Sequence, residues 1–178
     1  MFDCILIHYG ELGLKGLNRP VFEKRLVENI LRALEGLDFK KIRKIQGRII
    51  LELKENADLI KFERLLMKVF GISWFAFCFT TDAALESIKK LTEEKYKLKA
   101  GAKLKVSAKR ADKTLPFTSM DVNRELGAYL VEKFNVEVSL KNPQKEIFVE
   151  LADGKAYVFD RKIKGLYGLP VGISGKVL

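Results

Sequence analysis

The chain has 178 residues, of which 48% are hydrophobic and 31% charged. This composition excludes global disorder and is sufficient for one large folded domain or two small ones. Its 33 basic and 23 acidic side chains give a formal net charge of +10, which favours a polyanionic partner. The sequence has neither an apolar run of about 18 residues nor a signal-peptide pattern, so we predict a cytoplasmic protein without membrane association.

Reactive residue types are scarce. Cys4 and Cys78 are the only cysteines, and both lie in apolar runs, which predicts buried thiols in a reducing compartment. His8 is the only histidine, so no histidine-paired nucleophile or multi-histidine metal site can form within one chain. We therefore predict no catalytic residue, no metal and no cofactor, and a packing role for His8.

The first 80 residues alternate between strand-like and helix-like patterns. Their order, β-α-β-β-α-β, predicts a ferredoxin-like domain over residues 1–80 and an α+β fold class. The expected elements are a strand over 2–8, a helix over 20–34 ending before Gly36, strands over 39–45 and 48–53, a helix from about 57, and a strand over 72–79.

The second half predicts another α/β domain, over residues 81–178. Thr118 or Ser119 is positioned to cap a helix, and Gly127 within that helix suggests close backbone packing. Asp153-Gly154 predicts a tight hairpin. The expected elements are a helix over 83–96, a strand from 103, the capped helix to about 134, and strands over 136–140, 146–151 and 155–159.

The most informative stretch is the strand at 103–109, because it alternates strictly. Leu104, Val106 and Ala108 fall on one face, and Lys103, Lys105, Ser107 and Lys109 fall on the other. Cations held in a row repel one another unless an anion lies across them. A phosphate backbone, with a charge at every nucleotide, suits such a row, so the strand predicts nucleic-acid binding.

Residues after this strand extend the same prediction. Arg110, Lys113 and Phe117 combine cations with an aromatic ring, which suits single-stranded RNA. The alternative for Phe117 is packing in the core.

Two further segments place cations beside glycines. Lys15 and Arg19 bracket the start of a helix, where an anion is favoured, although an ordinary loop with solvated cations explains them equally well. Arg161, Lys162 and Lys164 lead into a glycine-rich turn around Gly168, which suits a backbone-clamping surface. The alternative for that turn is a structural role with solubilising lysines.

Four segments together resemble the N-terminal half of the 4-thiouridine tRNA sulfurtransferases, which also take part in making the thiazole of thiamine. They are residues 8–20, residues 109–113, Asn142-Pro143 and residues 168–172. The resemblance implies a ferredoxin-like domain followed by a THUMP domain, and binding of tRNA at its acceptor end near the 3′ terminus. In that family the chemistry resides in a later ATP-using domain that opens with Ser-Gly-Gly-x-Asp-Ser, and this sequence stops before it.

Our leading hypothesis is a non-catalytic tRNA-binding module in which both domains contribute to one basic surface. The alternatives are an RNA-binding subunit of a sulfurtransferase assembled in trans with a catalytic polypeptide, and a ferredoxin-like regulatory protein whose charge serves solubility. The sequence leaves open whether the chain forms a homodimer. The predicted RNA-binding residues are Lys15, Arg19, Lys103, Lys105, Lys109, Arg110, Lys113, Phe117, Asn142, Arg161, Lys162, Lys164 and Gly168.

Overall fold

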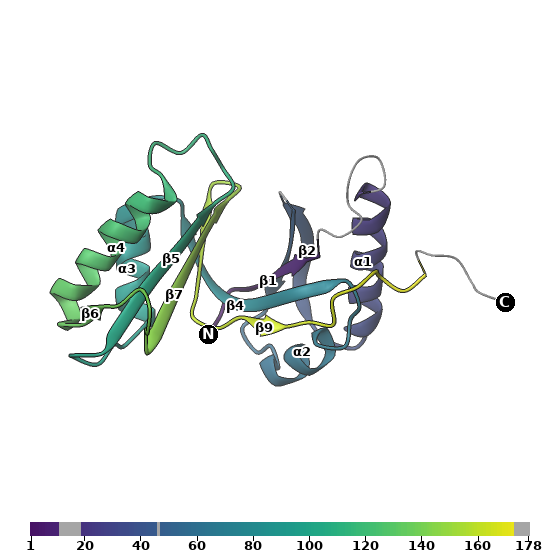
Figure 1. Cartoon of the computed structure of the whole chain (residues 1–178). Coiled ribbons are helices and arrows are strands. Elements are labelled where there is room, and N and C mark those ends of the chain that lie inside the picture. Colours follow the sequence, from purple (N-terminus) through teal and green to yellow (C-terminus); the bar gives the residue numbers. More distant parts are fainter. Residues whose placement is uncertain (11–18, 46, 173–178) are drawn as a thin grey trace. The chain divides into compact units, whose positions relative to one another are not determined.

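The computed structural model describes residues 1–10, 19–45 and 47–172 (Figure 1). The chain divides into two compact units, one formed by Asp3–Ala76 with the segment from Lys162 onward, and the other by Met1–Phe2 with Phe77–Arg161. In the described part of the chain, no helix is long and apolar enough to cross a bilayer.

The first unit has the predicted β-α-β-β-α-β order and thus a ferredoxin-like fold. Its sheet has the strand order β2-β3-β1-β4, and β3 lies antiparallel to both β1 and β2. A short strand, β9, adds to β4. The elements are β1 (Cys4–Tyr9), α1 (Arg19–Ala33), β2 (Phe39–Ile45), β3 (Arg48–Leu53), α2 (Leu59–Leu66), β4 (Ile72–Asp82) and β9 (Ile163–Lys164).

Helical periodicity explains how this sheet is covered. Phe22, Leu26 and Ile30 recur along α1 and are buried, as are Phe62 and Leu66 of α2. The second helix begins two residues later than predicted. Asp58 caps it, because its carboxylate accepts the backbone N–H of Lys61 at 3.0 Å.

The second unit is an α/β domain whose mixed sheet has the strand order β4-β8-β7-β5-β6. Strand β5 runs parallel to β6 and β7, whereas β8 runs antiparallel to β7 and β4. The predicted hairpin is confirmed, with Asp153 and Gly154 at φ of 54° and 69°. The elements are the end of β4, α3 (Leu85–Lys95), β5 (Lys103–Arg110), α4 (Ser119–Phe134), β6 (Glu137–Val138), β7 (Lys145–Ala152) and β8 (Lys155–Phe159).

One face of this second sheet carries the core. Leu104 and Val106 of β5 are buried, 1% and 8% exposed, in a cluster with apolar residues of α3 and α4. Thr118 caps α4 through a capping box with Asp121, as predicted for that position.

The structure divides the chain differently from the prediction, which placed residues 81–178 in one domain. From Lys162 onward the chain returns to the ferredoxin-like unit. There, Ile163 pairs with Phe75 and Lys164 with Trp74, and the N–H of Gly165 donates to the carbonyl of Ser73 at 3.0 Å. A strand of two residues is too short to show periodicity, which is why the sequence pattern did not indicate it.

The glycine required by close packing is Gly165 and not Gly127. The expectation for Gly127 was wrong, because a Cβ atom added there meets nothing within 4 Å. A Cβ atom on Gly165 would lie 2.3 Å from the carbonyl oxygen of Ile72. That oxygen belongs to the β4 backbone, which cannot move aside without disturbing the sheet.

We predict opposite effects for alanine at these two positions. Gly165→Ala should destabilise the ferredoxin-like unit by about 1–3 kcal/mol, because the methyl group overlaps the main chain of β4. Gly127→Ala should be neutral or stabilising by up to about 1 kcal/mol, because alanine favours a helix interior and the space is open. Thermal unfolding of the two purified variants measures both. Equal stability of the two variants would contradict the packing at Gly165.

Candidate nucleic-acid interface

The alternation of β5 is confirmed in the structure. Leu104 and Val106 point into the core, and Lys103 and Lys109 are exposed on the other face. Packing of the apolar face fixes the register, so the lysines stand on a rigid strand. Among the described residues, neither Lys103 nor Lys109 forms an ion pair.

The neighbouring strand supplies carboxylates that the sequence argument did not anticipate. In the parallel register, Glu146 of β7 lies opposite Lys105, and Glu150 lies opposite Lys109. The Nζ atom of Lys105 is 3.2 Å from the Oε1 atom of Glu146, and the Ser107 hydroxyl donates to the same carboxylate. The prediction of an uncompensated row of cations was therefore wrong for Lys105.

Arg110 has a structural role at the end of β5. Its Nη1 atom donates to the carbonyl oxygens of Leu115 at 3.1 Å and Phe117 at 2.7 Å, which closes the loop leading to α4. Asp112 tightens the same loop by accepting the N–H of Thr114 at 2.9 Å. Lys113 is exposed on this braced loop.

Phe117 packs against the core. Its ring is partly buried and lies beside the hydrophobic cluster of the second unit. This packing supports the alternative role given to Phe117, although one part of the ring remains accessible.

Asn142 lies near the other end of β5. It is exposed in a loop that two hydrogen bonds attach to Lys103, because the N–H of Lys103 donates to the Gln144 side chain at 3.0 Å and the N–H of Gln144 donates back at 2.8 Å. The structure thus groups Lys103 with Asn142, and Lys109 with Arg110 and Lys113. About 20 Å of strand separates the two groups, given about 3.3 Å per residue.

In the ferredoxin-like unit, Arg19 is committed to internal contacts, and Lys15 lies outside the described residues. The Nε atom of Arg19 donates to Glu23 at 2.9 Å, and its Nη2 atom donates to the Tyr9 hydroxyl at 3.4 Å. Tyr9 donates to the same carboxylate, and Lys44 of β2 lies 3.5 Å from it. Glu23 therefore joins α1 to β1 and β2.

The protonation equilibria of this cluster follow from these contacts. Burial, followed by the hydrogen bond to Glu23, raises the pKa of Tyr9 to about 12. Hydrogen bonds to Tyr9 and Glu23 raise the pKa of Arg19 above its ordinary value. Burial acts to raise the pKa of Glu23, but hydrogen bonds from Tyr9 and Arg19 outweigh it and lower that pKa.

A cation–aromatic cluster was missed from the sequence. The ring of His8 stacks on that of Trp74, with centroids 4.0 Å apart, and the Nζ atom of Lys162 lies 4.8 Å from the Trp74 centroid. The stacking gives His8 the packing role that was predicted. The contact of Trp74 with His8 could have been found from the predicted fold, in which β1 and β4 are neighbouring strands.

Other predicted residues of the C-terminal segment are accessible. Arg161, Lys164 and Gly168 are all exposed. Gly168 has a φ of 75°, which favours glycine, and it follows Tyr167 at 52°.

Comparison with known proteins identifies both units. The model of the ThiI ferredoxin-like domain matches residues 4–76, and the model of the THUMP domain matches residues 80–160. The chain contains a ThiI ferredoxin-like domain and a THUMP domain. The match to the THUMP model ends before Lys162, in agreement with the packing of the C-terminal segment against the ferredoxin-like domain.

A relative of known sequence matches the chain over its whole length. A probable tRNA sulfurtransferase of Moorella thermoacetica is 42% identical over 179 residues, spanning 100% of this chain and 45% of the relative. Thus the chain spans less than half the length of that relative.

Two solved structures are similar. PH1313 of Pyrococcus horikoshii has a TM-score of 0.83 at 35% identity, covering 96% of this chain and 57% of that one. A 4-thiouridine synthetase crystallised with RNA and ATP has a TM-score of 0.76 at 32% identity, covering 99% of this chain and 45% of that one.

The carboxylate of Glu23, which binds Tyr9 and Arg19, gives a prediction about how stability depends on pH. Folding lowers the pKa of Glu23 below its ordinary value of 4.5. The ionised carboxylate therefore stabilises the fold at pH values above 4.5, and this stabilisation is lost as the pH falls through the pKa of the folded state. Glu23→Gln should lower the free energy of unfolding by about 1 kcal/mol at pH 7, and this difference should shrink below pH 4.

Urea unfolding at pH 7 and pH 3 measures this difference. Glu28→Gln on the same helix is the matched control, because the ion pair of Glu28 with Arg25 is about 41% exposed on both sides and should contribute little. A loss for Glu23→Gln that is the same at both pH values would contradict the ion-pair contribution.

Proposed function

We propose that this chain is a non-catalytic tRNA-binding module whose RNA-binding face is the lysine-bearing side of β5 in the THUMP domain. The observation that carries the proposal is the pair of exposed lysines, Lys103 and Lys109, on a strand whose register is fixed by the core. Neither lysine is neutralised by an ion pair in the described part of the chain. Each is therefore available to replace counterions along a phosphate backbone.

The remaining predicted residues have different roles in this proposal. Lys113 and Asn142 are exposed at opposite ends of β5 and extend the contact along the RNA. Arg110 acts as a positioning residue, because its hydrogen bonds hold the loop that carries Lys113. Lys105 contributes less, since Glu146 already compensates its charge.

The family of the domain and one structural relative support tRNA as the substrate class. A THUMP domain occurs in this chain, and the relative of known structure that was crystallised with RNA is a 4-thiouridine synthetase. We infer that the ligand is tRNA gripped near its acceptor end and presented for 4-thiouridine formation. In this proposal, the modification itself is carried out by a catalytic domain in the part of the tRNA sulfurtransferases that this chain does not span.

A second candidate function takes account of what the Moorella relative is called. Since that relative is a probable tRNA sulfurtransferase, the chain fits the RNA-binding subunit of such an enzyme assembled in trans with a polypeptide that carries the ATP-using domain. In that arrangement the RNA-binding face is the same, and the catalytic companion is an additional partner.

The salt dependence of tRNA binding tests the proposed face. The logarithm of the association constant should fall linearly with the logarithm of the salt concentration, and Lys109→Ala should flatten that slope by about 0.7–0.9, the contribution of one phosphate. The stability of this variant should stay within about 0.5 kcal/mol of the parent, because Lys109 is exposed. Fluorescence anisotropy at several salt concentrations measures the slope.

Arg124→Ala is the matched control for Lys109→Ala. Arg124 is 72% exposed on α4, on the helical side of the same domain, and its removal changes the net charge by the same amount. Its slope should equal that of the parent. If both variants flatten the slope equally, binding follows net charge and the β5 face has no special role.

The acceptor-end inference predicts a difference between RNA ligands. A minihelix that reproduces the acceptor arm should bind nearly as tightly as whole tRNA, and removal of its terminal CCA should weaken binding more than shuffling the anticodon stem of whole tRNA. A gel-shift series with these four RNAs compares the affinities. Equal binding of the minihelices with and without CCA would contradict acceptor-end recognition while leaving tRNA binding intact.

A further inference from the structure

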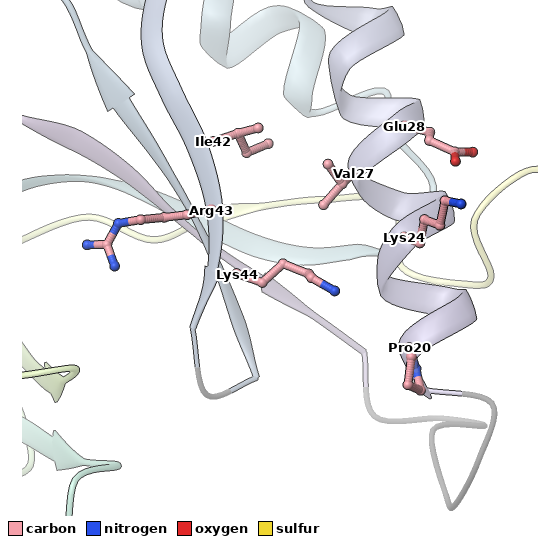
Figure 2. Close-up of a pocket in the computed structure, with 7 residues that line it drawn as sticks. All are labelled: Pro20, Lys24, Val27, Glu28, Ile42, Arg43 and Lys44. Atoms are coloured by element: carbon pink, nitrogen blue, oxygen red, sulfur yellow. The ribbon is translucent and has the colours of Figure 1, made fainter.

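A groove in the ferredoxin-like domain runs beside a free sheet edge. Strand β2 is the last strand on its side of the sheet and pairs only with β3 among the described strands. A hollow of about 500 Å³ lies between this strand and α1 (Figure 2). The backbone groups on the outer edge of β2 are therefore next to a space that another chain segment can fill.

The lining of the groove is apolar at its floor. Figure 2 shows Val27 of α1 and Ile42 of β2 pointing toward each other across the hollow, with Pro20 at one end. Both Val27 and Ile42 are only partly buried. None of the described residues that line the hollow is aromatic, so they offer no ring on which a nucleic-acid base could stack.

The rim of the groove is predominantly cationic. Lys24 forms no ion pair among the described residues, and Lys44, which points toward α1, keeps a side chain that is 47% exposed. Arg43 points to the opposite face of the sheet, where it pairs with Glu52 at 3.2 Å. Among the described residues of the lining, Glu28 is the one acidic side chain, and it pairs with Arg25.

Lysines on an edge strand protect it from pairing with other sheets, and the four cations of β2 serve that purpose in part. Edge protection alone, however, does not require an apolar hollow beside the strand. An edge strand next to a helix, with an apolar floor, has the geometry by which an extended peptide adds to a sheet and places alternate side chains against the helix.

We propose that the groove between α1 and β2 binds an extended acidic peptide, which adds as a strand to β2. On the side of the peptide strand that faces α1, an apolar side chain contacts Val27 and Ile42, and a carboxylate two residues along the peptide faces Lys24 and Lys44. This groove belongs to the ferredoxin-like unit, whereas the proposed RNA face belongs to the THUMP domain.

A suitable probe is a seven-residue glutamate–valine peptide, Thr-Glu-Thr-Val-Thr-Glu-Thr, blocked at both ends, because its glutamate and valine side chains share one face of the strand. Titrated into the ¹⁵N-labelled full chain, it should shift the backbone amide signals of β2 and α1, with a Kd below about 1 mM. The same peptide N-methylated at every residue cannot donate strand hydrogen bonds to β2 and should bind at least tenfold more weakly. A lysine–valine peptide should not bind.

Substitutions in the groove complete the test. Ile42→Glu and Lys24→Glu should each weaken binding of the glutamate–valine peptide at least tenfold. Ile60→Glu and Lys61→Glu are the matched controls, because both residues are exposed on α2, away from the groove, and Ile60 is 82% exposed. If Ile42→Glu loses the folded spectrum, Lys24→Glu still decides the outcome.

Three results would overturn the proposal. The first is the absence of amide shifts at millimolar peptide. The second is equal binding of the N-methylated and unmodified peptides, since strand addition requires free backbone N–H groups. The third is an oligouridine that shifts the same amides and displaces the peptide, which would assign the groove to RNA.

Discussion

The parallel pairing of β5 with β7 is the interaction on which the THUMP domain and its proposed RNA face depend. This register places Val106 in the core opposite Ile147 of β7, with Leu104 buried on the same face, and it leaves Lys103 and Lys109 on the exposed face. A shift of the β5 register by one residue would turn the lysines into the core. The free-energy cost of burying these charges would exceed what the strand hydrogen bonds contribute. Core packing and the position of the cations are therefore one constraint.

The same register explains which parts of the site could be predicted from the sequence. The alternation within β5 is a local pattern, so the exposed lysines could be placed without a structure. The compensation of Lys105 by Glu146 depends on which residue of β7 lies opposite, and the sequence does not specify that register. The pairing of Lys164 with Trp74 joins residues 90 positions apart through a strand of two residues, so neither β9 nor the true extent of the first domain could be predicted.

The two arginines show why residue type alone is a weak guide to an RNA interface. Both Arg19 and Arg110 lie in segments that suggested phosphate binding, yet the structure gives each a set of internal acceptors. A guanidinium has several donors in a fixed plane, so it can fasten a loop or a helix end as readily as it can bind a phosphate. Lysine has a single flexible ammonium group and is less suited to fastening a loop or a helix end by several hydrogen bonds. The exposed lysines of β5 are therefore the stronger candidates for contact with RNA.

Cations alone therefore do not distinguish a nucleic-acid surface from a protein-binding one in this chain, because β2 and β5 are both rich in lysine. Their surroundings differ. On β5, the lysines share their face with Ser107 and Glu146, and the apolar residues of that strand are buried in the core. On β2, Lys44 borders a hollow floored by Ile42 and Val27, where apolar surface remains accessible beside unpaired backbone. An apolar floor does not stabilise a bound phosphate. A peptide strand, in contrast, forms backbone hydrogen bonds with the edge strand and apolar contacts with the floor, so accessible apolar surface distinguishes a peptide-binding site from an RNA-binding one.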